Sequence, residues 1–256
     1  MTGEQETVGS VLRACRLLGS FGVDRPVVTL AELTADSGLN KPTVHRLMST
    51  FVAAGWVSRD AAGAYRVRLP LFAIASAALG ELDLRDHARG ELDGLATGFG
   101  NTAFLMVPSE AGAVVIDRVE GGRSLQVAGL SVGTVLPFHA AAAPVVMAAF
   151  DDESRAALLA RDLPSYTPLT LTDHDLLERR LAEVRDAGWA SSHADYLSGV
   201  SAVAAPVTSG PSAELVATLS LGGPSDDFEG PALDERVAAV RVAAGRLSDS
   251  LASMPR

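Results

Sequence analysis

The segment from Thr29 to Val67 constrains the fold more than any other part of this 256-residue chain. Thr29 is a favourable helix N-cap, and Glu32, three residues later, completes a capping box. Asn40 caps a second helix, in which Pro42 lies in the first turn, where a missing N–H costs little. We therefore predict two helices separated by a tight turn at the glycine between them.

The residues after the second cap extend this pattern into a winged helix-turn-helix. Val44, Leu47, Met48 and Phe51 recur at helical spacing and predict one buried face. The following segment, WVSRDAAGAYRVRL, predicts two short strands around a turn, and a further helix is predicted upstream over Val8 to Phe21. Helix, short helix, tight turn, helix and hairpin thus follow one another within about 60 residues.

The outer face of the helix after Asn40 is polar and suits contact with DNA. A recognition helix presents its first turns to base edges in the major groove. Arg46 can bind guanine through two hydrogen bonds, Thr43 can contact a thymine methyl group and His45 can donate to an acceptor. The predicted DNA-contacting residues, including phosphate contacts at helix starts and in the wing, are Thr29, Asn40, Lys41, Pro42, Thr43, His45, Arg46, Ser49, Arg59, Tyr65 and Arg66. The alternatives are an ordinary solvated helix face and a domain of this shape that binds protein.

Charge distribution separates this region from the rest of the chain. The formal net charge of −10 by itself argues against nucleic-acid binding, because basic surface supplies most of the affinity for DNA. Residues 1–79, however, carry a net charge of +2 and the remainder carries −12. The N-terminal region can therefore contact phosphates, whereas the acidic remainder would be repelled from DNA and must have another role.

The second region alternates helix and strand patterns. Strands are predicted at 101–107, 113–119, 124–130, 203–207 and 215–221, and helices at 84–100, 142–150, 151–161, 173–187 and 231–252. The predicted fold class is α+β, with an N-terminal winged helix-turn-helix, a connecting helix, and a C-terminal domain in which helices flank a mainly antiparallel sheet. The predicted boundaries are 8–70 for the first domain, 71–84 for the connecting helix and 85–252 for the second domain.

Other classes of function lack a sequence signature. There is no GxSxG, Walker, GxGxxG or HExxH motif, and only His193 and Asp195 come loosely near metal-ligand spacing. We therefore expect no enzyme activity, no metal and no cofactor. The single cysteine, Cys15, excludes an internal disulfide. Because there is no basic leader and no apolar run long enough for a membrane span, we expect a cytoplasmic protein without membrane contact.

Motifs along the whole chain occur in the order of a known family. TLAELTADSGLNKPTVHRLMSTFVAAGWVSRDAAGAYRV is followed by LRDHARGELDGLA, AVVIDRVE, VGTVLPFHAAA, AGWASSHADYLSGVSAVAAPV and ATLSLGGP. In these segments the chain resembles the isocitrate lyase regulator (IclR) family of bacterial transcription factors. The resemblance implies a homodimer or a dimer-of-dimers tetramer, and a GAF-like C-terminal domain that binds a small-molecule effector. Two-fold symmetry then predicts a pseudo-palindromic operator in double-stranded DNA.

The resemblance also implies an effector pocket lined from three places. These are the strand and loop up to Phe138, the helix start after His139, and the segment around Ser192 to Ala202. In family members that bind small carboxylates, backbone N–H groups at that helix start hold the anion, as free donors and the helix dipole allow. The implied effector-binding residues are Phe104, Met106, Leu125, Leu136, Phe138, His139, Ala142, Ala143, Ser192, His193, Asp195, Val200, Ala202 and Ser220.

This chain departs from the family pattern at the implied pocket. Pro144-Val145 stands where the family usually has Gly-Lys, so one donor is missing at the helix start. Ala202 stands where several members carry a cysteine, and Ser192 where an aspartate is frequent. We predict a larger, partly apolar effector anchored by a few polar groups, among them Asp195. Two alternatives are that these apolar residues are ordinary core, and that the domain is ligand-free and serves oligomerisation.

Overall fold

The computed structural model describes residues 7–22, 25–71, 73–74, 84–122, 130–210 and 213–253. The chain divides into two compact units, residues 1–82 and residues 83–256. The predicted connecting helix at 71–84 and the predicted strand at 124–130 fall largely outside the described residues.

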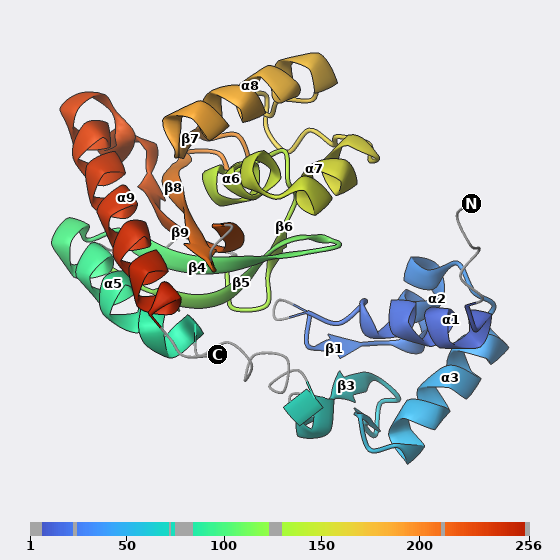
Figure 1. The fold of residues 1–256 in the computed structure, drawn as a ribbon. Helices are drawn as coiled ribbons and strands as arrows, with labels where there is room; N and C mark the ends of the chain where they lie inside the picture. Colours follow the sequence, from blue (N-terminus) through green and yellow to red (C-terminus); the bar gives the residue numbers. More distant parts are fainter. Residues whose placement is uncertain are drawn as a thin grey trace. The chain divides into compact units, whose positions relative to one another are not determined.

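The first unit is a winged helix-turn-helix (Figure 1). Its helices are α1 (Gly9–Leu18), α2 (Leu30–Ser37) and α3 (Lys41–Ala53), and its strands are β1 (Val27–Val28), β2 (Val57–Arg59) and β3 (Tyr65–Val67). The strands form an antiparallel sheet in the order β1-β3-β2. Strand β1 was not predicted, because two residues are too short to show an alternating pattern and the strand exists only through its pairing with β3.

Local capping chemistry sets the helix boundaries of this unit. The Thr29 hydroxyl accepts from the N–H of Glu32 at 3.3 Å, and the Thr29 N–H donates to the Glu32 carboxylate at 2.7 Å, so the predicted capping box forms. Gly38 has φ +64°, a left-handed conformation that closes α2. The Asn40 side chain accepts from the N–H of Thr43 at 3.0 Å and begins α3.

The second unit contains a six-stranded antiparallel sheet in the order β6-β5-β4-β9-β8-β7. The strands are β4 (Thr102–Ser109), β5 (Gly112–Val119), β6 (Val135–Leu136), β7 (Ala190–His193), β8 (Val200–Ser209) and β9 (Glu214–Pro224). Helices α5 (Leu84–Phe99) and α9 (Gly230–Ala252) cover one face, while α6 (Ala142–Phe150), α7 (Asp152–Leu159) and α8 (His174–Ala187) lie on the other side (Figure 1). The short helix η1 (Ser225–Phe228) joins β9 to α9. This arrangement is the predicted α+β class.

Helix α6 is the centre of the second core. Nearly all of its residues are buried, in keeping with a helix that is apolar all round. It packs against α8 and against the sheet strands β4, β8 and β9. Phe104 of β4 and Ala202 of β8 belong to the same apolar cluster as the helix. In the described part of the chain, no helix combines the length and the apolar character needed to cross a membrane.

Strand β7 is an edge strand that the sequence pattern did not reveal. Its residues, ASSH, are mostly polar and lack alternating large apolar side chains. An edge strand bonds to one neighbour only, so polar residues are tolerated there. Its pairing with β8 places Ser192 opposite Ala202, which brings two predicted pocket residues together.

Candidate DNA interface and ligand pocket

Helix α3 separates buried apolar residues from an exposed polar face. Val44 and Met48 are fully buried and Phe51 is nearly so, against the apolar sides of α1 and α2. Thr43 is half-buried, at the edge between the two faces. The predicted contact residues that are exposed on α3 and its cap are Asn40, Lys41, Pro42, His45, Arg46 and Ser49.

Positive charge on α3 and the wing is not neutralised by nearby acids. Within the described residues, the basic side chains of this surface have no carboxylate partner, whereas Arg25 pairs with Asp36 at 2.7 Å and with Glu32 at 3.4 Å. Uncompensated cations attract a polyanion more strongly than paired ones. We call these residues the cationic face: Lys41, Arg46, Arg66 and Arg68.

Of two wing residues predicted to contact DNA, Arg59 is exposed and Tyr65 is buried. Arg59 is exposed, with its Nε donating to the carbonyl of Gly63 at 3.3 Å and its guanidinium carbon 5.6 Å from the Tyr65 ring centroid. Tyr65 is only 1% exposed and belongs to the core of the unit. The prediction that Tyr65 contacts phosphate is therefore wrong in this structure. In a strand, successive side chains alternate, and Arg66 takes the outer face while Tyr65 takes the inner one.

The two N-caps are already engaged within the protein. The Thr29 hydroxyl donates to the Glu32 carboxylate at 2.6 Å. These hydrogen bonds from the Thr29 hydroxyl and backbone, with a smaller contribution from Arg25, hold the pKa of Glu32 below its usual value. Thr29 and Asn40 therefore position α2 and α3, and any contact that they make with phosphate is additional to this role.

The second unit contains a pocket between the sheet and the first turn of α6. The cavity itself has a volume of about 30 Å³, within about 430 Å³ of space that no atom fills and that includes open solvent. The implied effector residues that line it come from β4, β6, α6, β7, β8, β9 and the β7–β8 loop. They are Phe104, Met106, Leu136, Ala142, Ala143, Ser192, Asp195, Val200, Ala202 and Ser220.

Other implied residues lie elsewhere. Phe138 is buried in the adjacent core and is not part of the pocket lining. The Nε2 of His139 lies 2.9 Å from the carbonyl of Pro164, so this histidine binds backbone rather than facing the pocket. His193 lines a second groove, formed by α8, β7 and the loop before α8 and here called the outer groove, which Asp195 also lines. Leu125 lies outside the described residues.

The structure also adds pocket-lining residues that were not named one by one from the sequence. Those inside the three implied segments are Leu130, Ala141, Pro144, Tyr196, Leu197 and Ser201, and Gly222 lies outside them. The two-residue period of β9 places Gly222 on the same face as Ser220, a signal present in the sequence. No periodicity singles out Ala141 and Tyr196, because they lie in loops.

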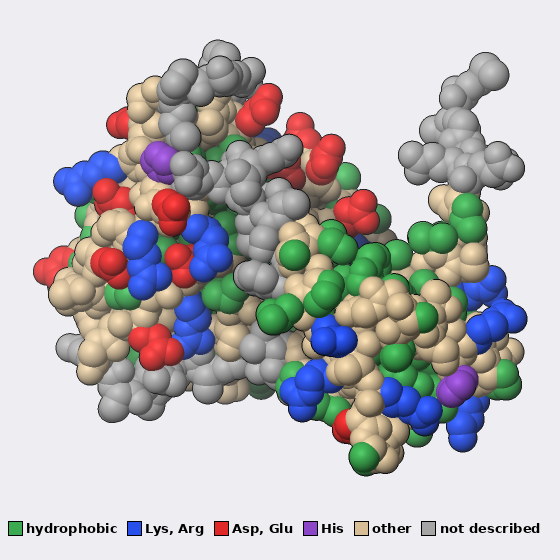
Figure 2. Space-filling model, turned by 90° about the horizontal axis from the view of Figure 1, so that it is seen from below, with side chains coloured by type: hydrophobic (Ala, Val, Ile, Leu, Met, Phe, Trp, Pro, Cys, Tyr) green, Lys and Arg blue, Asp and Glu red, His purple; other side chains and the backbone are tan. Residues whose placement is uncertain are grey.

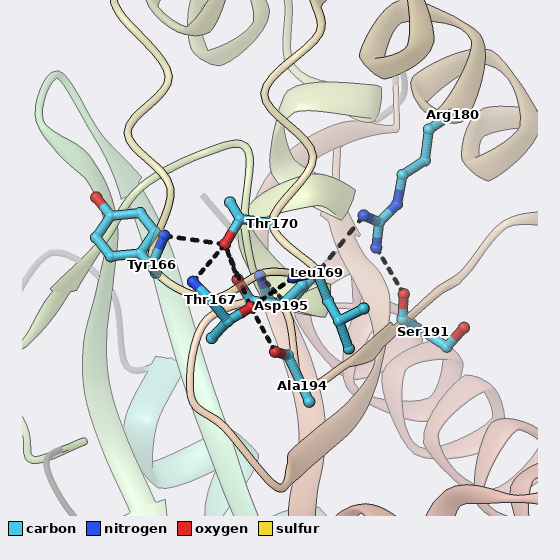
Figure 3. Close-up of polar contacts among 9 residues, drawn as sticks. Tyr166, Thr167, Leu169, Thr170, Arg180, Ser191, Ala194 and Asp195 are labelled. Carbon is cyan, nitrogen blue, oxygen red and sulfur yellow. Dashed lines mark hydrogen bonds and ion pairs between the residues drawn. The ribbon is translucent and has the colours of Figure 1, made fainter.

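Asp195 makes the central polar contacts of this pocket and is only 4% exposed. One carboxylate oxygen accepts from the N–H of Ala141 at 3.0 Å, and the other lies 3.4 Å from a guanidinium nitrogen of Arg180. Figure 3 shows the backbone around it tied to the loop before α8. Thr170 donates to the carbonyl of Asp195 at 2.6 Å, and Thr167 donates to that of Ala194 at 2.8 Å.

The side chains that could hold a metal ion are dispersed. Among the described residues, no three His, Cys, Asp or Glu side chains lie close enough together to hold one. The lone Cys15 is exposed on α1, distant in sequence from the pocket residues. The mainly apolar lining of the pocket, with a few polar groups, suits the binding of a small molecule.

Two family models match the chain and together cover most of it. The IclR helix-turn-helix domain matches residues 10–61, and the bacterial transcriptional regulator IclR C-terminal domain matches residues 76–249. The HTH-type transcriptional regulator XynR of Escherichia coli is 30% identical over 84% of this chain and 85% of its own length.

Solved structures agree with this match. A transcriptional regulator from Silicibacter sp. TM1040 has a TM-score of 0.84 at 28% identity, covering 96% of this chain and 98% of its own. An IclR homologue from Microbacterium hydrocarbonoxydans, complexed with 4-hydroxybenzoate, has a TM-score of 0.77 at 24% identity, covering 95% and 99%. The chain belongs to the IclR family of bacterial transcriptional regulators, with a helix-turn-helix DNA-binding domain followed by the family's C-terminal domain.

Proposed function

We propose that this regulator binds a specific operator through α3 and the wing, and that a small molecule in the C-terminal pocket controls this binding. The observation that carries the proposal is the unpaired cationic face of the first unit. Arg46 reads a guanine in the major groove, while Lys41, Arg59 and Arg66 contact phosphates. Sequence-specific binding combines both kinds of contact.

The regulator acts as a homodimer on a pseudo-palindromic operator, alone or as a dimer of dimers. Helix α1 supports this because it exposes apolar side chains that its own unit does not cover: Val8 is 64% exposed, Val11 57% and Leu12 46%. A self-complementary contact there places two recognition helices about 34–36 Å apart, one turn of DNA. A cytoplasmic dimer seated on a promoter represses transcription by excluding polymerase.

The ligand is a small aromatic or partly apolar molecule. The pocket walls are mainly apolar, with Phe104 and Met106 on one side and the first turn of α6 on the other. Such a lining with a few polar groups suits a ring-containing ligand. The Microbacterium homologue holds 4-hydroxybenzoate, a small aromatic carboxylate, so a ring-containing ligand has a precedent in a protein of this fold.

The test starts from the operator itself. Bound sites are mapped across the host genome, and the full-length protein is titrated onto one such site by fluorescence anisotropy with and without a panel of small aromatic compounds. At least one compound is expected to change operator affinity several-fold. Ala202→Leu fills the pocket and should abolish the response, while Glu183→Gln, on the outer groove, should retain it.

The competing function is a second unit that serves only assembly. Ligand-independent operator affinity across the whole panel, together with an oligomer that dissociates when the second unit is removed, would favour that alternative. A response that survives in Ala202→Leu would place the effector outside this pocket.

A further inference from the structure

Asp195 places a fixed negative charge at the start of α6, where the helix would otherwise offer donors to an anion. Its carboxylate oxygen lies 3.0 Å from the N–H of Ala141, the residue that precedes the first turn of the helix. A carboxylate at a helix N-terminus is favoured by the free N–H groups and by the dipole. The protein therefore supplies from its own chain the anion that this position favours.

The Asp195 carboxylate sets the charge that a ligand meets in the pocket. Among the described residues that line it, Asp195 carries the one carboxylate, and the other polar side chains are hydroxyls. Arg180 lies at the far oxygen of Asp195, does not line the pocket, and also donates to the carbonyl of Ser191 at 2.8 Å. A ligand carboxylate entering the pocket meets a like charge before it reaches this arginine.

The surrounding backbone holds Asp195 in place. Ala141 and Ala194, the residues on the two sides of the Asp195 contact, have φ of +65° and +48°, conformations that are strained for alanine. Thr167 and Thr170 tie the carbonyls of Ala194 and Asp195 to the loop before α8 (Figure 3). Turning the carboxylate away from the pocket would therefore break several contacts at once.

Two serine side chains of the pocket are available to a ligand. Ser192 is 6% exposed and Ser220 is 3% exposed, both line the pocket, and neither side chain has a hydrogen-bond partner in the described part of the chain. Ser192 lies on β7 and Ser220 on β9, so they approach the cavity from two strands. A hydroxyl both donates and accepts, so these two residues can bind a polar group of a ligand from two sides.

We propose that Asp195 is the specificity-determining residue of this pocket. The ligand class is a small aromatic that carries an amino group, and the pocket discriminates against carboxylates. The donor of the ligand meets the Asp195 carboxylate, Ser192 and Ser220 bind a second polar group, and the apolar walls enclose the ring. This inference rests on the proposed ligand-binding role of the pocket and specifies its chemistry.

The experiment uses three probes that share a phenol ring and differ in the tail. Tyramine carries an ammonium group, 4-ethylphenol is neutral, and 3-(4-hydroxyphenyl)propionate carries a carboxylate. Binding to the full-length protein is measured by isothermal titration calorimetry in the absence of DNA. Tyramine should bind about tenfold or more tightly than the propionate, with 4-ethylphenol in between.

Two variants with the same change in charge sharpen the test. Asp195→Asn should remove the advantage of tyramine and strengthen binding of the propionate, whereas Glu183→Gln, on the outer groove, should keep the wild-type order. Thermal melts identify any variant that fails to fold. In that case, the order of affinities of the three probes for the wild-type protein tests the proposal.

Equal or tighter binding of the propionate to the wild-type protein would overturn the proposal, as would an unchanged order in a folded Asp195→Asn variant. Failure of all three probes to bind would also overturn it. Because these measurements contain no DNA, probes that bind in the expected order without altering operator affinity would contradict the proposed effector control and leave this inference standing.

Discussion

The two units of this regulator differ in whether their basic side chains are paired with carboxylates. On the first unit, the cations of α3 and the wing have no acidic partner among the described residues. On the second, several arginines are paired with carboxylates: Arg85 and Arg89 share Asp117, and Arg246 lies near Glu91. Figure 2 shows this on one face, with blue side chains largely free of red ones on one unit and mixed with them on the other.

This difference explains how an acidic chain can present a basic surface. The net charge of −10 describes the whole sequence, whereas the unpaired cations of α3 and the wing lie on the first unit. Arginines that are neutralised by neighbouring carboxylates contribute little to an external field. The pairing of charges, more than their sum, therefore distinguishes the helix-turn-helix domain from the second unit.

The units also differ in the size of their cores. The first core consists of eight buried residues around α3, whereas the second extends from the sheet through the whole of α6 to α8. Small domains bury a smaller fraction of their surface and are less stable. We expect the first unit to unfold more readily than the second.

The largest expected effect tests this difference in stability. Met48 is fully buried, so Met48→Ala should destabilise the first unit by about 2–5 kcal/mol through lost burial and the cavity left behind. Hydrogen exchange followed by mass spectrometry should show faster exchange in residues of the first unit and little change in the second. Ser49→Ala, at an exposed position of the same helix, is the control. A parallel loss of protection in both units would show that they are not independent.

The next effect tests the difference in charge. Arg46→Ala should cost about 1–3 kcal/mol per half-site and relax base preference, since the lost contact reads a base edge. Arg25→Ala should change affinity much less, because this arginine is already paired with Asp36. Anisotropy titrations on the operator and on single-base variants measure both quantities. An equal loss from the two substitutions would mean that pairing does not decide which cations bind DNA.

The wing is expected to contribute without reading sequence. Arg59→Ala should weaken binding by a similar factor on every operator variant and reduce the slope of log affinity against log salt by about 1. The same titrations repeated at several salt concentrations test this. If Arg46→Ala and Arg59→Ala both cause losses that are independent of sequence, the assignment of Arg46 to base recognition is wrong.

A smaller effect is expected at the cap of α2. Thr29→Ala removes the capping box and should lower the stability of the first unit by about 1 kcal/mol. Thr29→Ser keeps the hydroxyl and should restore most of it. Urea denaturation followed by circular dichroism resolves this difference. A full loss in the serine variant would assign the effect to packing of the threonine methyl group.

The smallest expected effect is a pH dependence of the stability that the same cap contributes. The folded-state pKa of Glu32 lies below its ordinary value of 4.5, so its contacts stabilise the fold above that pH and are lost as pH falls through the lower, folded value. Wild type should therefore be more stable than Glu32→Gln near neutral pH, and the difference should shrink in acid below about pH 4.5. Melting curves across this range measure it. A difference that is independent of pH would exclude the charge as its cause.

Much of the first unit could be predicted because its determinants are local. The Thr29 capping box, the Asn40 cap and the apolar spacing of α3 each involve residues within a few positions of one another. Tyr65 was misplaced because a three-residue strand gives no pattern that distinguishes its faces. Its burial depends on the core that α1 and α3 form around it.

The pocket could be predicted only in outline. The resemblance implied the right strands and the α6 start, and the structure brings ten of the implied residues to one cavity. His139 and His193 lie elsewhere, because closeness to a pocket in sequence does not fix the direction of a side chain. That direction depends on hydrogen-bond partners from other segments. For His139 that partner is the carbonyl of Pro164, 25 residues away.

By itself, the sequence determined the order of the elements, the helix caps, the exposed polar face of α3 and the basic character of the first region, all of which depend on short-range pattern and composition. Only the tertiary structure decided which charges are paired and which are free. It also joined Asp195 to Ala141 across 54 residues, which is how the start of α6 acquired an internal carboxylate. Contacts between distant segments follow from the packing of the sheet, the helices and the loops together, and no local pattern encodes them.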